Sequence, residues 1–182
     1  MKKLCIFCGS STNVAQNHLD LGKEVGHLLA EKNIGLVYGA GSTGVMGSLA
    51  DSVLEKGGKV WGVIPDFMIP WEVCHQNLTD LKITKTMHER KQIMYDYSDG
   101  FVALPGGLGT MEELCEILTW RQIGTHEKHV WILNPNGFYD GLMDHFKKLH
   151  HERFVSDEHL ELIQERNDMN EIVSEFLNGE II

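Results

Sequence analysis

The amino-acid sequence predicts an α/β protein with a mostly parallel central sheet and helices on both faces of that sheet. Short apolar runs alternate with amphipathic stretches along the chain, as expected when each strand is followed by a helix that leads to a parallel neighbour. Three of the runs end in glycine- or serine-rich turns, which read CGSS, YGAGSTG and PGGLGT. A length of 182 residues with a hydrophobic fraction of 42% suits one domain over residues 1–182.

Four strands are expected in the first half of the chain, because four short apolar runs are bounded by turn residues. They cover Leu4–Cys8, Ile34–Tyr38, Lys59–Ile64 and Leu81–Thr84. Apolar residues at helical spacing predict helices over Val14–Lys32 and Val45–Lys56, and a glycine pair ends the second helix. The long connection Pro65–Asp80 is expected to line part of a site, because connections of this length are more often functional than passive.

The second half of the chain repeats the alternation of strands and helices. Helices are expected over Met87–Tyr97, Thr110–Ile123 and Phe138–His151, and a last helix begins at the cap-like residue Asp168. Strands are expected over Gly100–Leu104 and His129–Leu133, with a weak strand around Leu160–Ile163. Ligands of such sheets bind at the carboxyl ends of the strands, so the three glycine- or serine-rich turns are candidates for one common pocket.

Composition and charge argue against several classes of protein. A formal net charge of −10 does not suit a general binder of nucleic acid or of anionic membranes, because such partners need a basic surface. No apolar run approaches the ~20 residues that cross a bilayer. The apolar run near the N-terminus has about six residues, against the ~7–15 of a signal peptide. We therefore expect a cytoplasmic protein without membrane or nucleic-acid partners.

The cysteines and histidines do not predict a metal site. Cys5 and Cys8 form a C-x-x-C pair, but they lie on an expected strand, where residues three apart point to opposite faces. A second cysteine pair that would complete a metal set is missing, so both thiols are expected to pack in the core. The histidine pairs His126/His129 and His150/His151 also lack further ligands at suitable spacing.

The glycine-rich turns indicate a small anionic ligand. Gly39–Gly44 matches G-x-G-x-x-G between a strand and a helix, which is a weak indication of a dinucleotide site. The turn at Pro105 lacks the G-K-[ST] ending of a P-loop, so a triphosphate is not expected. A monophosphate suits both turns, because glycines allow close approach and a following helix directs free N–H groups at the anion.

Two charged residues stand out beside these turns. Met87, Arg90, Met94 and Tyr97 fall on one helical stripe, so Arg90 occupies a position where the pattern favours an apolar residue. Arg90 could form a structural ion pair, or its guanidinium could hold both a carboxylate and a substrate. Glu113 could complete a capping box with Thr110, or its carboxylate could face the electron-poor part of a phosphorylated ligand.

Together, the segments VYGAGSTGVMG, MHERK and PGGLGTMEE resemble the Lonely Guy (LOG) family of cytokinin riboside 5′-monophosphate phosphoribohydrolases, which are often mislabelled as lysine decarboxylases. The resemblance runs from Phe7 to about Phe154, and Ala40 departs from it where members commonly have glycine. It implies a Rossmann-like fold, a homodimer, and Arg90 and Glu113 as the catalytic pair. The substrate-binding positions that it implies are Gly9, Ser10, Gly41, Ser42, Gly44, Glu72, Met87, Lys91, Pro105, Gly106, Gly107, Gly109 and Thr110.

The implied reaction is hydrolysis of the N-glycosidic bond of a purine (cytokinin riboside or adenosine) 5′-monophosphate, which releases the base and ribose 5-phosphate. Positive charge develops at the ribose in such a reaction, so a carboxylate would stabilise the transition state and could orient water. No metal or organic cofactor is required. Two alternatives remain at this stage, a non-catalytic nucleotide or cofactor carrier and an NAD-linked enzyme.

Overall fold

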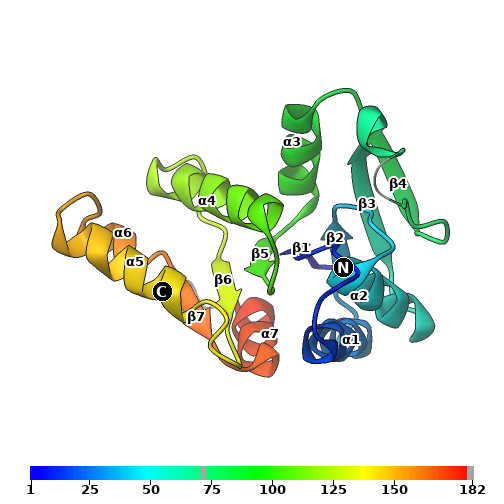
Figure 1. The fold of residues 1–182 in the computed structure, drawn as a ribbon, viewed down its shortest axis with the longest axis horizontal. Helices are drawn as coiled ribbons and strands as arrows, with labels where there is room; N and C mark the ends of the chain where they lie inside the picture. Colours follow the sequence, from blue (N-terminus) through cyan, green and yellow to red (C-terminus); the bar gives the residue numbers. More distant parts are fainter. Residues whose placement is uncertain (71–72, 180–182) are drawn as a thin grey trace.

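The computed structural model describes residues 1–70 and 73–179, and within them a seven-stranded, all-parallel sheet has the order β4-β3-β2-β1-β5-β6-β7 (Figure 1). Each strand except the two at the edges pairs with parallel neighbours on both sides. The strands are β1 (Lys3–Phe7), β2 (Gly35–Tyr38), β3 (Val60–Pro65), β4 (Asp80–Thr84), β5 (Gly100–Ala103), β6 (Val130–Leu133) and β7 (Gln164–Arg166).

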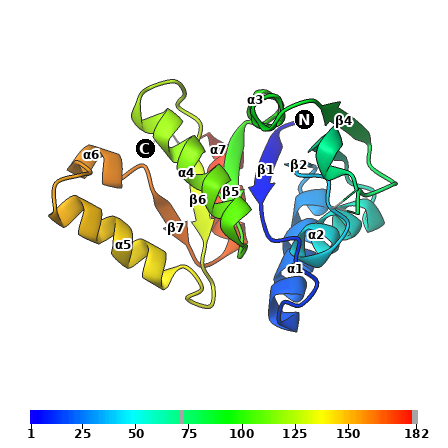
Figure 2. The same cartoon turned by 45° about the horizontal axis from the view of Figure 1, so that its top comes forward.

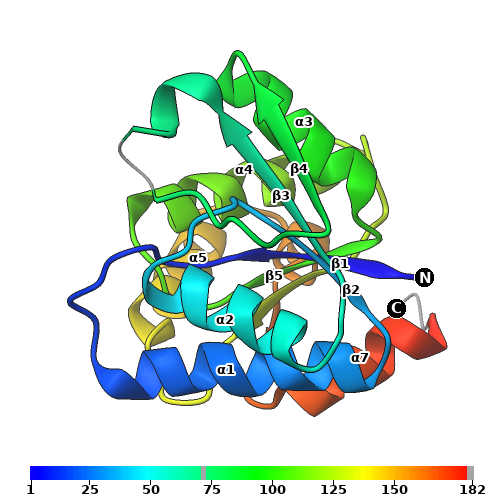
Figure 3. The same ribbon diagram turned by 90° about the vertical axis from the view of Figure 1, so that its right-hand side faces the viewer.

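Helices cover both faces of the sheet, as Figure 3 shows. One face carries α1 (Gln16–Glu31), α2 (Gly44–Glu55) and α7 (Met169–Asn178), and the other carries α3 (Met87–Tyr97), α4 (Leu108–Gln122) and α5 (Asp140–His151). Two short helical segments complete the described elements, η1 (Asp66–Met68) and α6 (Asp157–Leu160). The helices α5 and α6 lie at one end of the sheet and β4 at the other (Figure 2).

Apart from Lys3 at the start of β1, the central strands are apolar because both of their faces are covered, as parallel sheets require. In β1, Leu4 and Ile6 belong to the core beneath α1, α2 and α7, whereas Cys5 and Phe7 belong to the core beneath α3, α4 and α5. Cys8 lies on the Leu4 side. Cys5 and Cys8 are therefore buried on opposite faces, which confirms the core interpretation of the C-x-x-C pair.

The order in which strands are added to the sheet changes direction at β1. The first four strands proceed from β1 outward to β4, and β5 then pairs with the other side of β1, with Leu4 opposite Gly100 and Phe7 opposite Ala103. Loops that leave neighbouring strands at such a switch point diverge and form a crevice. The β1–α1 and β5–α4 loops are the two at this position.

Most of the expected elements are confirmed within two residues at each end, but the expected strand around Leu160–Ile163 is wrong. Residues 157–160 form α6, because Ser156 caps this turn by accepting a hydrogen bond from His159 N, and the last strand is Gln164–Arg166 beside β6. Helix α1 begins at Gln16 and α5 at Asp140, two residues later than expected. Helix α4 begins at Leu108, two residues early. Among the described residues, no helix is long and apolar enough to cross a membrane.

Helices α1 and α2 pack unusually closely, and this contact yields a first prediction. A Cβ added at Gly26 would lie 2.5 Å from Leu49 O and 2.8 Å from Ser52 Cβ. Although alanine is the better helix former by ~1 kcal/mol, overpacking at ~1–3 kcal/mol outweighs that gain. We expect Gly26→Ala to lower the free energy of unfolding by ~1–2 kcal/mol in chemical denaturation.

Gly141→Ala on α5 is the matched control, since a Cβ there would meet nothing within 4 Å. Its free energy of unfolding should stay level or rise by ~0.5 kcal/mol. Equal stabilisation of both variants would contradict the close α1–α2 contact.

Candidate active site

A cavity of about 310 Å³ lies at the switch point between β1 and β5. Its walls come from the β1–α1 loop, the start of α2, segment η1, helix α3 and the start of α4. The lining residues are Cys8, Gly9, Ser10, Ser11, Met46, Met68, Arg90, Gly107, Leu108, Gly109, Thr110 and Glu113. Of the residues expected at a site, the structure thus brings Gly9, Ser10, Arg90, Gly107, Gly109, Thr110 and Glu113 together around one space.

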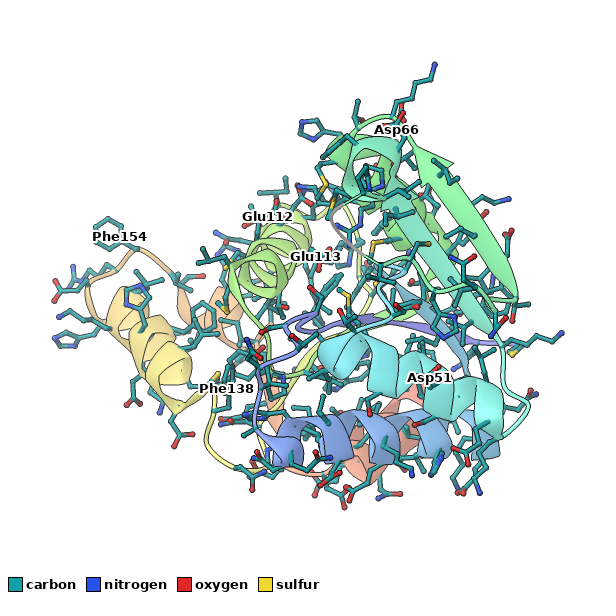
Figure 4. All side chains as sticks on the ribbon, turned by 45° about the vertical axis from the view of Figure 1, so that its right-hand side comes forward. Asp51, Asp66, Glu112, Glu113, Phe138 and Phe154 are labelled. Carbon is teal, nitrogen blue, oxygen red and sulfur yellow. The ribbon has the colours of Figure 1, made fainter. Side chains whose placement is uncertain are left out.

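Glu113 lies on the inner side of α4, whereas Glu112 lies on its outer side (Figure 4). The Glu113 side chain is 6% exposed, and it shares its helix face with Thr110, one turn earlier. The capping-box interpretation of these two residues is wrong, because α4 begins at Leu108 with Gly107 as its N-cap and Thr110 already lies within the helix. Glu113 is a buried acid at the cavity wall.

Arg90 reaches Glu113 from the neighbouring helix α3. Its Nη2 lies 3.3 Å from Glu113 Oε1, and its Nε donates to the carbonyl of Val63 at 3.2 Å. Helix α3 starts at the expected residue because Thr86 caps it by accepting from Glu89 N. The inward stripe of α3 is confirmed, since Arg90 and Met94 are the buried residues of this helix. Both members of the charged pair are almost fully desolvated.

Gly39 makes room for the guanidinium. A Cβ added at Gly39 would collide with Arg90 Nη2 and would also lie 3.1 Å from Met46 Cε. Gly39 thus has a steric role toward Arg90.

The PGGLGT turn presents a helix start to the cavity. The amides of Leu108, Gly109 and Thr110 belong to the first turn of α4, and Met111 N makes the first bond back, to Gly107 O. The amides of a first turn have no partner within their helix and carry the positive end of its dipole. Together with the Thr110 hydroxyl, they are donors suited to an anion one turn from Glu113, and we refer to them as the anion receptor.

This turn is packed directly against the β1–α1 loop. Gly9 N donates to Pro105 O at 3.2 Å, and a Cβ on Gly106 would collide with Thr110 Oγ1 and lie 2.9 Å from Gly9 N. Pro105 and Gly106 therefore shape the receptor from behind. They face a separate apolar pocket that Phe138 and His18 also line.

The second glycine turn supports the site without lining it. Ser42 donates through both its N–H and its hydroxyl to Val73 O, and Gly41 forms an antiparallel bridge with Cys74. Thr43 Oγ1 donates to Ser10 O at 2.7 Å, while Met46 N donates to Gly9 O.

The start of α2 is thus directed at protein carbonyls, and Gly41, Ser42 and Gly44 lie outside the cavity lining. Gly44 has a positive φ of 61°, and a Cβ there would collide with the Ser10–Ser11 backbone. The departure at Ala40 also has a structural consequence, because this alanine adopts a φ of 66° in the left-handed region.

Met87 and Lys91 lie beside the Arg90–Glu113 ion pair on helix α3. Met87 Sδ is 4.0 Å from Arg90 Nη1, and Lys91 Nζ pairs with Glu112 at 2.6 Å and with Glu116 at 2.8 Å. Burial acts to lower the pKa of Lys91, but the two carboxylates leave it above its usual value. Neither residue is among the described residues that line the cavity. Glu72, the remaining expected residue, lies outside the described residues.

Sequence reasoning missed the apolar lining of the cavity. Met46 comes from the first turn of α2, Met68 from η1, and Leu108 from the PGGLGT turn itself, where it is 90% exposed. The only available signal was their position next to glycine turns and in the long Pro65–Asp80 connection, which does contribute a wall through Met68.

Comparison with known proteins places this geometry in a family. A family model described as "Possible lysine decarboxylase" matches residues 46–176. Cytokinin riboside 5′-monophosphate phosphoribohydrolase LOG1 of Arabidopsis thaliana is 43% identical over 155 residues, which are 85% of this chain and 73% of LOG1. The chain belongs to the LOG family. LOG3 of the same plant is 39% identical over 172 residues, 94% of this chain and 80% of LOG3.

Solved structures show that the fold extends beyond LOG proteins. The Moco carrier protein from Chlamydomonas reinhardtii superposes with a TM-score of 0.73 at 22% identity, covering 98% of this chain and 99% of that one. DNA processing protein A from Helicobacter pylori superposes with a TM-score of 0.60 at 13% identity, covering 98% and 81%. At these identities the likeness concerns the Rossmann-type architecture alone.

The packing of Gly106 yields a prediction about anion binding. Gly106→Ala forces the Thr110 side chain out of its position, so the receptor loses a hydroxyl donor and its fitted backbone. Loss of one hydrogen bond to a charged group, at ~1.5–3 kcal/mol, should weaken binding of inorganic phosphate by ~10-fold or more in titration calorimetry.

Gly109→Ala is the comparison variant. A Cβ at Gly109 would meet no protein atom within 4 Å, so this substitution can crowd a bound ligand but not the protein itself. It should retain the unfolding temperature of the parent chain. If Gly106→Ala binds phosphate with unchanged affinity, the PGGLGT turn is not part of the anion-binding site.

Proposed function

We propose that this LOG-family chain is an N-glycosyl hydrolase that cleaves a purine nucleoside 5′-monophosphate into free base and ribose 5-phosphate. One observation carries the proposal: the anion receptor at the start of α4 and the buried carboxylate of Glu113 lie one helical turn apart on one cavity wall. The names of the relatives support the same activity, since LOG1 and LOG3 are phosphoribohydrolases of cytokinin riboside 5′-monophosphate.

The geometry supports a definite orientation of the substrate. The 5′-phosphate sits on the amides of residues 108–110 and the Thr110 hydroxyl, and the ribose spans one turn of α4 toward Glu113. The base then meets the apolar side chains of Met46 and Met68, whose flexible thioethers suit the flat face of a purine. Apolar lining of this kind accepts adenine and N6-substituted adenines alike.

Glu113 acts where charge appears during the reaction. As the N-glycosidic bond breaks, positive charge develops at C1′ and the ring oxygen, and a fixed carboxylate in a desolvated wall stabilises that charge more than the neutral ground state. The same carboxylate can orient the attacking water toward C1′. Arg90 holds the Glu113 side chain in place and offsets its charge while the phosphate binds nearby.

The two alternative functions lose support at named residues. A carrier has no need of the Arg90–Glu113 pair, and the likeness to the Moco carrier protein is one of fold. A dinucleotide site would need the Gly39–Gly44 turn open to pyrophosphate, whereas Ser42 contacts Val73 and Thr43 contacts Ser10.

We also propose that the protein is a cytoplasmic homodimer. Large apolar side chains are exposed on several elements, among them Ile123 at 66% and Phe154 at 78%, and Phe154 projects from the end of the molecule in Figure 4. A second copy would bury such side chains. The four cysteines form no disulfide in the described residues, which suits a reducing compartment. Light scattering at micromolar concentration should give twice the mass of the chain, and a monomer mass would contradict the dimer.

The proposed reaction predicts a strict requirement for the 5′-phosphate. Incubation with AMP should release adenine and ribose 5-phosphate, seen by chromatography, also in the presence of a chelator. Three charge-assisted hydrogen bonds at about 1.5 kcal/mol each give roughly 4.5 kcal/mol, so kcat/KM for AMP should exceed that for adenosine by ~10³-fold. Equal kcat/KM values for AMP and adenosine would show that the anion receptor does not bind the 5′-phosphate. If both AMP and N6-substituted AMP stay intact after long incubation, the proposed hydrolase activity is wrong.

The role of Glu113 predicts a loss that its neighbour does not share. Glu113→Gln keeps the shape of the side chain and removes the charge, so kcat should fall by ~10²-fold or more, equivalent to roughly 3 kcal/mol of electrostatic stabilisation. Glu112→Gln changes the adjacent, outward carboxylate and should keep kcat within ~2-fold, a loss of less than 0.5 kcal/mol. Similar rates for the two variants would show that Glu113 has no role in the chemical step.

A further inference from the structure

The PGGLGT turn is held from outside the cavity by a side chain that no motif contains. Strand β5 ends at Ala103, and the next residue, Leu104, is fully buried and donates its N–H to Phe7 O. Its carbonyl accepts a hydrogen bond of 2.6 Å from the Tyr139 hydroxyl. Tyr139 comes from the β6–α5 connection and is 2% exposed.

Tyr139 is itself fixed by a buried amide. Its N–H donates to Asn134 Oδ1 at 2.8 Å, while Asn134 Nδ2 donates to Asp140 Oδ1 at 2.8 Å and to Glu165 Oε1 at 2.6 Å. Asn134 is 2% exposed and follows strand β6 directly. A continuous chain of hydrogen bonds thus runs from β7 and α5 to the residue before Pro105.

The hydrogen bonds end at Leu104, and this position matters because the backbone that follows it has little conformational freedom. Pro105 has a fixed φ and restricts the residue before it, so the direction of the Leu104–Pro105 peptide decides where the turn begins. Beyond it, Pro105 O is bonded to Gly9 N, and Gly106 packs against Thr110. A rotation at Leu104 would therefore be transmitted to the amides of the anion receptor.

We propose that Tyr139, oriented by Asn134, is a positioning residue that sets the phosphate receptor for the 5′-phosphate of the substrate. The inference rests on the proposed function and extends it to residues that do not touch the cavity. Burial, with a smaller effect from Cys8, raises the pKa of Tyr139 well above its usual value, so the phenol stays a donor over the whole working range of pH.

The test replaces the hydroxyl alone. Tyr139→Phe should raise KM for AMP and the inhibition constants of inorganic phosphate and ribose 5-phosphate by about 3- to 10-fold, the effect of one displaced hydrogen bond. The value of kcat should stay within ~2-fold and the inhibition constant of adenine should not change. Tyr97→Phe, which removes a hydroxyl at the far end of α3, is the matched control and should leave all five quantities unchanged.

A second variant checks the route through the loop. If Tyr139 acts by placing Thr110, then Thr110→Val and Tyr139→Phe together should raise KM by less than the product of their separate effects. A multiplicative effect would show that the two residues act independently and would overturn the inference.

The remaining outcomes also decide the question. Unchanged phosphate inhibition in Tyr139→Phe, or equal losses for phosphate and adenine, would overturn the positioning role, as would failure of Tyr139→Phe to fold when Tyr97→Phe folds. An inactive parent chain would end the proposed function instead, and binding of phosphate by calorimetry would then still report on Tyr139.

Discussion

The buried ion pair between Arg90 and Glu113 is the interaction on which the arrangement of the site depends. Removing two charges from water costs several kcal/mol per ion, and such a pair rarely stabilises a fold more than apolar residues of the same size would. Here the cost is partly offset by the Val63 carbonyl, which accepts from Arg90 Nε. The pair links α3 to α4 beside the cavity, and loss of either partner would leave an uncompensated charge. Stability therefore does not explain its presence, which accords with the role proposed for Glu113.

Glycines in this protein have separate steric causes, whether or not they belong to a glycine-rich motif. Gly39 leaves space for the Arg90 guanidinium, Gly106 for Thr110, and Gly26 for the close approach of α1 and α2. At Ala40 the same chain accepts a left-handed alanine, at a cost of roughly 1–2 kcal/mol. Glycines in a glycine-rich turn can thus be required by close contacts within the protein, and not every one of them is needed for a ligand.

Hydrophobic patterning predicted the fold class, six of the seven strands and the separation of Cys5 from Cys8, because these depend on period and burial. The inward position of Arg90 also followed from helical spacing, and its association with Glu113 came from the resemblance to the LOG family. The role of the Gly39–Gly44 turn did not follow, since its contacts with Val73 and Ser10 join segments that are distant in sequence. Strand β7 was misplaced because its residues are polar, and Tyr139 could not be found because a lone hydroxyl acquires its partner only through tertiary packing.

The central position of β1 affects how the site can be assembled as the chain is synthesised. β1 pairs with β2 early, but its other neighbour is β5, so nearly a hundred residues separate Leu4 from Gly100 across the sheet. At a ribosomal rate of about 5–20 residues per second, the first strand waits several seconds with one edge unpaired. Glu113 leaves the ribosome only after that pairing partner has been made, so the Arg90–Glu113 ion pair forms late, after β1 to β5 have been synthesised. Long-range pairing of this kind slows folding, which makes shielding of the β1 edge important in the cell.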